Sequence, residues 1–427
     1  MTGTDTIATY REAEEYILSI PRFTSKNSLS DTRLFYEFLG KPGKDSTIIH
    51  VAGTNGKGSV CAYMESCLRH AGIRAGLFTS PHLVSMRERI RIGERMIEEE
   101  EFVRTFRRLA ACIKEYGKDY HPTFFEWLFF HAMLYFEAKK VPVILLETGL
   151  GGRLDATNAI DPPAVCVLTR IGLDHCEYLG DTVELIAGEK AGIVKAGSVV
   201  VYGEMETGIE EVINRKIQEC GCSSRKVYNT GDGFPQLKDK KIDFSFYSRY
   251  YDYIPLTAET TALYQPYNIR LALAALEEAG FGLTPEQMKA GVRAAKWEGR
   301  MEEIRPGVYL DGAHNRDGIE AFLESVRRDG CTGRRFLLFS MVEEKQFQSI
   351  CVQILSADLF EIIGVAPLRN ARGLKKEELR ALFQERLDFA FDGVKEALDC
   401  FLEMKKEDDR FYIAGSLYLV GEVKEYL

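Results

Sequence analysis

The sequence predicts an α/β fold built largely from parallel sheets. Short aliphatic or β-branched runs alternate with segments whose apolar residues recur at helical spacing, which is typical of α/β proteins. The apolar runs are nearly continuous and do not alternate with polar residues, so they indicate strands that are buried on both faces. We expect strands at residues 47–52, 143–147, 165–169, 199–201, 308–311, 336–340, 361–365 and 411–414.

Helical patterns follow several of these strands. Apolar residues fall at i, i+3 and i+4 spacing over residues 60–71, and Gly72 ends the pattern. The same spacing recurs over residues 319–326. A further helix is expected over residues 269–278, and a capping role at its start is the structural alternative for Asn268.

The length of the chain predicts more than one domain. A chain of 427 residues is too long to fold around one ordinary hydrophobic core. A helix ends and a new set of strands begins near residues 295–300, so we divide the chain into a large domain of residues 1–296 and a smaller one of residues 297–427. The polar and aromatic segment 228–253 is expected to form hairpins at the edge of the first domain.

Composition and charge exclude several functional classes. The formal net charge of -9 argues against nucleic-acid and anionic-membrane partners. No stretch approaches the roughly 20 apolar residues of a membrane span, and the polar, acidic N-terminus lacks a secretory signal, so a cytoplasmic protein is expected. The ten cysteines are scattered, which favours reduced thiols. No extra interface helix stands out, so we expect a monomer.

The strongest local signal is a glycine-rich turn between the first strand and its helix, Gly53-Thr54-Asn55-Gly56-Lys57-Gly58-Ser59. Glycines let backbone N–H groups face phosphate oxygens, and a helix N-terminus adds partial positive charge. Lys57 would reach the terminal phosphates of a bound phosphate ligand, and a hydroxyl of Thr54 or Ser59 would ligate magnesium. Gly58 separates the lysine from the serine, so the spacing departs from the usual phosphate loop, and a plain tight turn is the alternative.

This turn resembles the phosphate loop of the Mur ligase superfamily, and its GKGS ending resembles the folylpolyglutamate and dihydrofolate synthases. Other segments agree with that family in the same order along nearly the whole chain. They are SPHL at residues 80–83, ETGLGGRLDATN at 147–158, DH at 174–175, LGDT at 179–182, EKAGI at 189–193, Trp297 with Gly299 and Arg300, DGAHN at 311–315 and AGSL at 414–417. Two departures are Phe129, where the family often has threonine, and Glu298, where a proline is usual.

The resemblance implies a fold and an activity. The fold is an N-terminal P-loop-type domain with a mostly parallel sheet, which holds ATP and the folate site, followed by a C-terminal Rossmann-like glutamate-ligase domain. The activity is ATP-dependent addition of L-glutamate to a folate, with dihydropteroate as an open second acceptor. The reaction runs through an acyl phosphate and gives ADP and phosphate.

The resemblance also implies a magnesium site formed by Ser59, Ser80, Glu147 and His175. Magnesium prefers oxygen ligands, and Glu147 ends an apolar strand at the edge where α/β proteins bind ligands. Asp174 is suited to orient the ring of His175. A helix cap or a salt bridge is the alternative role for Glu147.

Lys190 has a role that the resemblance alone supplies. In Mur-type ligases the equivalent lysine is often carbamylated by CO2, and the resulting anion supports the metal and the acyl-phosphate pocket. Carbamylation needs a neutral amine, so burial must lower the pKa of Lys190. The alternatives are a salt bridge or a direct phosphate contact. The expected catalytic residues are Lys57, Lys190 and His175.

The remaining expected contacts are with ATP and with the two other substrates. The resemblance implies further ATP contacts at Asn268, Arg300, Asp311 and His314. It implies substrate contacts at Phe124, Gly151, Arg153, Asp155 and Ser416, the last beside the incoming amino acid. For each of these residues a structural role is the alternative, such as helix core for Phe124.

Three other functions remain open from the sequence. One is a Mur-type ligase that acts on a UDP-sugar peptide precursor, although its loop usually ends in GKTT. Another is a nucleotide-binding regulator without ligase activity, and the third is a simple P-loop kinase. The sequence does not distinguish dihydropteroate from reduced folates, and it does not give the length of the glutamate chain.

Overall fold

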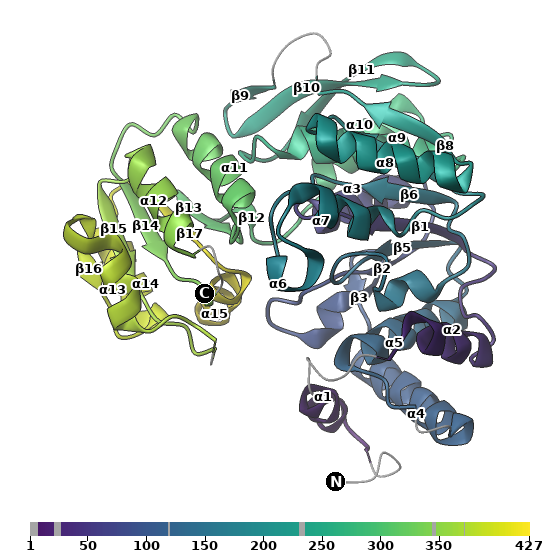
Figure 1. The fold of residues 1–427 in the computed structure, drawn as a ribbon. Coiled ribbons are helices and arrows are strands. Elements are labelled where there is room, and N and C mark those ends of the chain that lie inside the picture. Colours follow the sequence, from purple (N-terminus) through teal and green to yellow (C-terminus); the bar gives the residue numbers. More distant parts are fainter. Residues whose placement is uncertain (1–6, 21–26, 118–119, 230–234, 344–346, 371) are drawn as a thin grey trace. The chain divides into compact units, whose positions relative to one another are not determined.

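The computed structural model describes residues 7–20, 27–117, 120–229, 235–343, 347–370 and 372–427. The chain packs into two compact units that are not continuous in sequence. The first unit comprises Met1–Gly231, Phe246–Ile254 and Tyr267–Ala295, and the second comprises Asp232–Ser245, Pro255–Pro266 and Lys296–Leu427. Each unit contains a mostly parallel sheet with helices packed on it, which confirms the predicted α/β fold class (Figure 1).

The sheet of the first unit has eight strands. Their order is β4 (Arg95–Met96), β3 (Ile90–Ile92), β2 (Ala75–Phe78), β5 (Val143–Glu147), β1 (Thr47–Ala52), β6 (Val165–Leu168), β7 (Val199–Gly203) and β8 (Ser223–Val227). The run from β2 to β8 is parallel, whereas β3 and β4 are antiparallel additions at one edge. The central strand β1 therefore lies between β5 and β6, with its carboxyl end at the same edge as theirs.

Helices cover both faces of this sheet. On one face, α5 (Phe124–Lys139) packs over β2 and β5, while α7 (Val183–Ala191) and α8 (Thr207–Cys220) pack over β6 and β7. On the other face, α3 (Lys57–His70) contacts β1, β2 and β5, and α10 (Pro285–Ala294) packs on α3. Right-handed crossovers between parallel strands place α3 and α5 on opposite faces in this way.

An aromatic core lies beneath α5. The helices α1 (Tyr10–Ser19), α2 (Leu29–Phe38) and α4 (Glu99–Tyr116) share this core with α5. Its rings include Phe35, Phe106, Phe129 and Phe130, all of them wholly buried. Phe129, one of the two departures from the family pattern, is therefore a core residue.

The segment predicted to form hairpins contributes three strands. A separate sheet has the order β11 (Asp252–Ala258), β10 (Lys241–Ser248) and β9 (Gln236–Lys238), with β10 antiparallel to β9. Buried and exposed residues alternate along β10, the pattern of a strand that packs on one face only.

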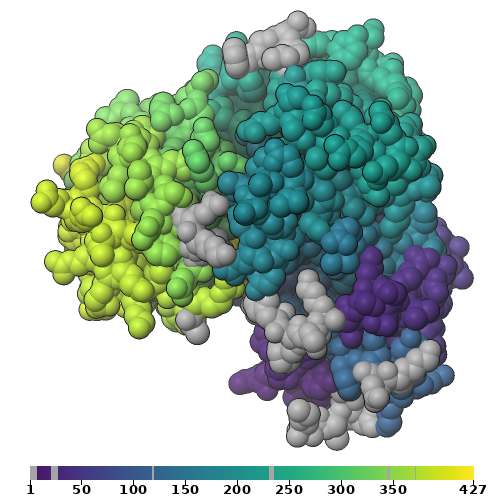
Figure 2. Space-filling view, in the orientation of Figure 1, coloured from purple at the N-terminus to yellow at the C-terminus, as the bar shows by residue number. Residues whose placement is uncertain are grey.

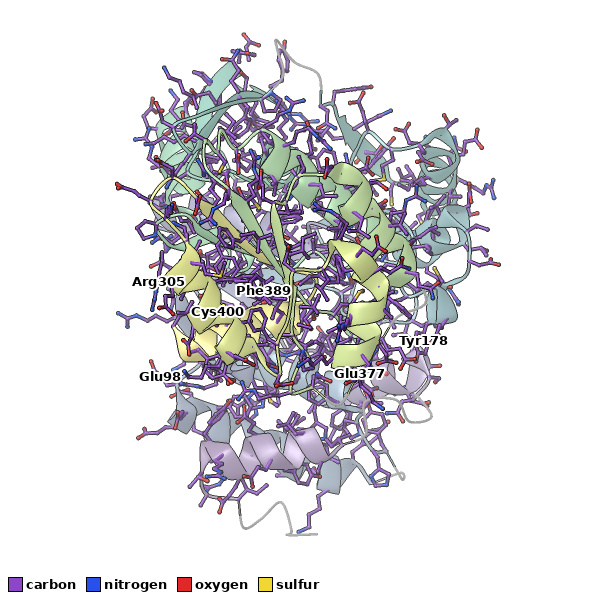
Figure 3. The ribbon with its side chains drawn as sticks, turned by 90° about the vertical axis from the view of Figure 1, so that its left-hand side faces the viewer. Glu98, Tyr178, Arg305, Glu377, Phe389 and Cys400 are labelled. Carbon is purple, nitrogen blue, oxygen red and sulfur yellow. The ribbon has the colours of Figure 1, made fainter. Side chains whose placement is uncertain are left out.

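The second unit contains a six-stranded sheet. Its order is β12 (Arg300–Arg305), β13 (Val308–Asp311), β17 (Arg410–Ala414), β14 (Arg335–Phe339), β15 (Ile362–Val365) and β16 (Phe389–Ala390). All neighbours are parallel except the pair β12 and β13. The helices are α11 (Arg316–Arg327), α12 (Phe347–Ala357), α13 (Lys376–Phe383), α14 (Val394–Met404) and α15 (Leu417–Tyr426). Phe389, labelled in Figure 3, stacks on Phe391 and meets Phe401 of α14 edge-on.

Three further features of the fold bear on the candidate site. The short helix α6 (Cys176–Leu179) precedes α7, and the region of α6 and α7 lies at the surface of the first unit (Figure 2). The helix α9 (Gln265–Glu278) begins before residue 269, so its predicted start is wrong, and Asn268 lies in its first turn and does not have the alternative capping role. None of the helices described has both the length and the apolar composition needed to cross a membrane.

Candidate active site

The glycine-rich turn joins β1 to α3, as predicted. Gly53 has φ +157° and Gly56 has φ +94°, and α3 begins at the next residue, Lys57. A Cβ atom at Gly53 would lie 1.8 Å from Oγ1 of Thr169, and one at Gly56 would lie 2.4 Å from Oδ1 of Asn268. Both positions therefore require glycine, and Asn268 contacts the turn that it was predicted to serve.

The turn is held by the segment that follows β6. The backbone N–H of Thr54 donates to the carbonyl of Arg170 at 2.8 Å, and its hydroxyl donates to the carbonyl of Gly172 at 3.0 Å. Ser59 lies buried in the first turn of α3, whose fourteen residues direct a partial positive charge toward the turn. The arrangement suits a bound phosphate.

Two ammonium groups share one carbonyl oxygen of this turn. Nζ of Lys57 donates to the carbonyls of Gly53 at 3.0 Å and Thr54 at 3.1 Å, while Nζ of Lys190 donates to that of Gly53 at 2.8 Å. The pKa of Lys190 is lowered to about 7, first by burial and then by the nearby charge of Lys57, while Asp174 and Asp155 act in the opposite direction. Lys190 thus has a substantial neutral fraction near neutral pH.

Glu147 brings a carboxylate to the same edge of the sheet. It is 3% exposed, it ends β5, and it is paired in register with Val51, two residues before Gly53. One of its carboxylate oxygens accepts a hydrogen bond from the backbone N–H of Ser80 at 3.1 Å. The predicted ligands Ser80 and Glu147 are therefore in contact.

His175 lies in a different environment. It adopts a left-handed conformation at the N-cap of α6, and its side chain is 45% exposed. Its Nε2 lies 3.8 Å from Oδ1 of Asp174, a carboxylate that is almost buried. Asp174 thus lies beside His175, at a separation between these two atoms that exceeds hydrogen-bonding distance, and its orienting role stays a prediction.

The donors at this edge are consistent with magnesium. Within the described ranges, no three His, Cys, Asp or Glu side chains gather closely enough to hold a metal ion alone. Magnesium binds in proteins through one or two carboxylates, with the remaining ligands supplied by water and substrate phosphates. The buried carboxylate of Glu147, beside the phosphate loop, fits that mode of binding.

The loop that follows β5, residues 148–155 and called the glycine-rich loop below, lies against α7. Two amides of this loop, the backbone N–H groups of Gly149 and Leu150, donate to Oδ2 of Asp155, each at 2.9 Å. A Cβ atom at Gly152 would lie 2.8 Å from the carbonyls of both Glu189 and Lys190. Burial raises the pKa of Asp155. The loop therefore reaches the same helix that carries Lys190.

Other predicted substrate residues differ in how accessible they are. Arg153 is exposed and forms an ion pair with Glu189. Gly151 has φ +71° and contacts Leu179, so it shapes the backbone of the loop. Phe124 is only 6% exposed, and its ring lies 5.5 Å from the guanidinium carbon of Arg89. Little of the Phe124 ring remains available to a substrate.

The exposed side of this region carries apolar residues. Tyr178 of α6, labelled in Figure 3, and Leu185 of α7 are both more than half exposed, as is Leu154 of the glycine-rich loop. Leu154 and Leu185 lie on the same loop and the same helix as Asp155 and Lys190, respectively.

Four of the predicted site residues belong to the second unit. Asp311 ends β13, is 2% exposed, and accepts hydrogen bonds from the hydroxyl of Tyr264 and from backbone N–H groups, while burial raises its pKa. Nδ1 of His314 is 2.7 Å from the carbonyl of Gly312, and a guanidinium nitrogen of Arg300 donates to the carbonyl of Gly299. Ser416 caps α15 by accepting a hydrogen bond from the N–H of Tyr418. Asp311 and Ser416 both lie at the carboxyl edge of this sheet.

Several neighbours of the site carry no claim from the sequence. The sequence singles out Phe124 and not Phe125, yet a Cβ atom at Gly149 would lie 2.5 Å from the ring of Phe125. His50 and Lys195 hydrogen-bond to the segment that follows the glycine-rich loop. In the sequence these two residues are marked only by their position: His50 precedes the glycine-rich turn, and Lys195 follows the EKAGI segment.

Comparison with known proteins agrees with this geometry. Residues 299–417 match the family model described as "Mur ligase, glutamate ligase domain". The dihydrofolate synthase/folylpolyglutamate synthase of Bacillus subtilis is 31% identical over 98% of this chain and 99% of its own length. The predicted family relationship is thereby confirmed.

Solved structures extend the similarity to three dimensions. Escherichia coli FolC in complex with DHPP and ADP superposes with a TM-score of 0.86 and 28% identity, covering 98% of this chain and 97% of that one. An FPGS–AMPPCP–folate complex gives a TM-score of 0.83 and 28% identity, covering 98% and 99%. The chain belongs to the dihydrofolate synthase/folylpolyglutamate synthase family of the Mur ligases, which are ATP-dependent acid–amino-acid ligases.

Proposed function

We propose that this protein adds L-glutamate to a folate at the expense of ATP, by way of an acyl phosphate. One observation carries the proposal. Three features lie together at the carboxyl edge of one sheet: the phosphate-binding turn, the buried carboxylate of Glu147, and the amine of Lys190, whose pKa is about 7. The binding of nucleotide and folate by the solved relatives supports the same assignment.

The turn would bind the phosphates of ATP through its backbone N–H groups and the N-terminus of α3. Lys57 now donates to the carbonyls of its own turn, so the nucleotide would draw its ammonium group onto the terminal phosphates. The terminal carboxylate of the folate would then attack the γ-phosphorus, and the amino group of glutamate would attack the resulting acyl phosphate. The amide forms with release of ADP and phosphate.

We assign magnesium binding to Glu147, Ser59, Ser80 and His175. The metal would neutralise charge on the phosphate oxygens during transfer. Glu147 is the strongest member of this set, because its carboxylate is buried, accepts from the backbone of Ser80, and ends the strand beside the one that leads into the phosphate-binding turn. His175 is the weakest on geometry, since its side chain is nearly half exposed.

We further propose that Lys190 is carbamylated. Its pKa of about 7 leaves an amine that can react with CO2, and the removal of its positive charge would relieve the repulsion from Lys57. The protein equilibrated with 13C-bicarbonate should give a carbamate carbon resonance that disappears in Lys190→Arg. A spectrum identical to that of the variant would remove this assignment.

Roles in the second unit follow from the same resemblance. Arg300, Asp311 and His314 would contact ATP, and Ser416 would contact the incoming glutamate. Residues 1–296 would then form the domain for ATP and folate, and residues 297–427 the domain for glutamate. Asn268 supports the first half of this division, since it packs on Gly56 of the phosphate-binding turn.

The decisive experiment is a substrate comparison. The purified protein is assayed with ATP and L-glutamate, and with dihydropteroate or tetrahydrofolate in turn. We expect one ADP per glutamate added and no AMP. Formation of AMP would refute the acyl phosphate, and turnover of a UDP-sugar peptide precursor in place of a folate would refute the proposed acceptor.

The same assay separates the two folate activities. Turnover with tetrahydrofolate alone would indicate a folylpolyglutamate synthase, and turnover with both acceptors would indicate a bifunctional enzyme. The proposed partners are these small molecules, and we propose a cytoplasmic monomer.

A further inference from the structure

A buried histidine, His50, lies in the central strand that leads into the phosphate-binding turn, and the reaction described above does not use it. His50 occupies the middle of β1, three residues before Gly53, and it is wholly buried. Its side chain is on the face of the sheet that α5 covers at one end and α7 covers at the other. Nε2 of His50 lies 2.8 Å from the hydroxyl oxygen of Thr157, in the short helix η3 (Ala156–Ala159).

The direction of this hydrogen bond follows from the other partner of Thr157. The threonine hydroxyl has one hydrogen, which it donates to Oδ1 of Asp155 at 2.5 Å. The same oxygen must therefore accept from His50, so the imidazole carries its proton on Nε2. Burial lowers the pKa of His50, in keeping with a neutral ring, and its Nδ1 has no hydrogen-bond partner among the described residues.

The connection from His50 ends on the glycine-rich loop. Oδ1 of Asp155 also accepts from the backbone N–H of Thr157 at 3.0 Å, while its Oδ2 accepts from the N–H groups of Gly149 and Leu150. His50, Thr157 and Asp155 thus form a continuous chain of hydrogen bonds from the central strand to this loop. The strand is the one that leads directly into the phosphate-binding turn.

Lys195 adds a second anchor to the same segment. Its ammonium group donates to the carbonyls of Asn158 at 2.8 Å and Ile160 at 2.6 Å. These bonds hold the far end of η3, whereas the His50 chain reaches the carboxylate of Asp155 and, through it, the amides of Gly149 and Leu150. The two anchors therefore act on different parts of the segment.

We propose that His50 is a positioning residue for the folate acceptor: it acts through Thr157 and Asp155 to fix the glycine-rich loop relative to the phosphate-binding turn. An acyl transfer needs the folate carboxylate aligned with the γ-phosphate, and small misplacements are costly. A buried polar ring with an unpartnered nitrogen costs stability, which an apolar residue at this position of the strand would avoid. The inference rests on the proposed function, in which this loop contacts the folate.

The test compares four variants at this connection. His50→Leu removes the donor, Thr157→Val removes the hydroxyl with little change of shape, and the double variant removes both. His50→Gln keeps an amide N–H near the position of Nε2. The matched control is His131→Leu, because His131 is equally buried in α5 but packs its ring against Phe102 of α4.

We expect a selective loss with the folate. His50→Leu and Thr157→Val should each lower kcat/KM for the folate by roughly 10- to 100-fold while KM for ATP stays unchanged. The double variant should be no worse than the more severe single variant, because both remove the same connection. His50→Gln should recover part of the loss, and His131→Leu should leave both KM values unchanged.

Hydrogen exchange gives a second readout that needs no turnover. The amides of Gly149 and Leu150 should lose protection in His50→Leu and in Thr157→Val, and keep it in His131→Leu. Should the wild type fail to use any folate, the proposed function fails, while the exchange result still decides whether His50 holds the loop. Unchanged protection at these two amides, or an equal rise in KM for ATP and folate, would overturn the inference. If His50→Leu does not fold, Thr157→Val and His50→Gln test the same connection.

Discussion

Lys190 shows how a single buried charge links the stability of the fold to pH. Its ammonium group shares the carbonyl of Gly53 with Lys57, and burial holds its pKa at about 7, below the usual 10.5. Between these two values the unfolded chain binds more protons than the folded chain. The free energy of unfolding therefore rises with pH in this window, with a slope of up to about 1.4 kcal/mol per unit.

The first prediction compares the wild type with Lys190→Met, which cannot titrate at this position. We expect the wild type to gain stability relative to the variant as the pH rises from about 7 toward 10. Urea unfolding at several pH values in CO2-free buffer measures the difference. A difference that is flat, or that falls with pH, would show that Lys190 remains protonated in the fold.

The second prediction concerns Lys57 and Glu147, which we propose bind phosphate and metal. Lys57→Ala and Glu147→Ala should each lower kcat by roughly 100-fold or more, while the circular dichroism spectrum shows an intact fold. Near-normal activity in either variant would remove it from the proposed machinery.

Another buried carboxylate of the first unit supplies the control. Glu126 accepts hydrogen bonds from Thr32, Tyr120 and the N–H of Thr123 in the aromatic core. Glu126→Gln should lower the midpoint of urea unfolding and leave the requirement for magnesium unchanged, because its partners are all structural.

At the scale of elements, continuous apolar runs were the most reliable feature of the sequence. The strands predicted at residues 47–52, 143–147 and 308–311 match β1, β5 and β13 to the residue, because buried parallel strands have apolar residues on both faces. Short edge strands such as β4 and β16 escaped prediction, since two residues cannot show a period. The start of α9 was also misplaced, because Pro266 permits a helix to begin before Asn268.

The third prediction uses two glycines in helices of the first unit. A Cβ atom at Gly188, on the exposed side of α7, would meet nothing within 4 Å, whereas one at Gly291 of α10 would lie 2.5 Å from Cα of Cys67 in α3. Gly188→Ala should raise the free energy of unfolding by about 1 kcal/mol through helix propensity. Gly291→Ala should lower it by about 1–3 kcal/mol, because the two helix backbones must separate.

Urea unfolding of both variants under one set of conditions makes this comparison. Equal effects at the two positions would contradict the close packing of α10 on α3. The outcome matters for the candidate site because α3 carries Lys57 and Ser59 at its beginning.

At the scale of the whole molecule, motifs predicted the gathering of distant residues better than composition or periodicity did. Gly53, Glu147 and Lys190 are far apart in the sequence, and only the resemblance indicated that they lie together. In the structure Lys190 donates to the carbonyl of Gly53, and Glu147 is in register with Val51, two residues before Gly53. His50 escaped prediction because its hydrogen bond to Thr157 spans 107 residues and leaves no local pattern. Phe125 escaped for a related reason, since one aromatic residue in a run resembles the next.

The roles assigned to the second unit need a measurement that covers the whole chain. If Arg300, Asp311 and His314 contact ATP, a non-hydrolysable ATP analogue with magnesium should slow hydrogen exchange in two separate regions. One is residues 53–59 in the first unit, and the other is residues 299–301 and 311–315 in the second. Bound phosphates accept hydrogen bonds from amides, and binding suppresses the local opening that permits exchange.

The helix α14 and the strand β15 carry no proposed ATP contact, so peptides from them provide the internal control. Their exchange should change only if the nucleotide stabilises the second unit as a whole. Protection confined to residues 53–59 would remove Arg300, Asp311 and His314 from the ATP site. The binding of glutamate would then be the one role still proposed for the second unit. Protection in both regions that is lost in Lys57→Ala would show that one bound nucleotide accounts for both.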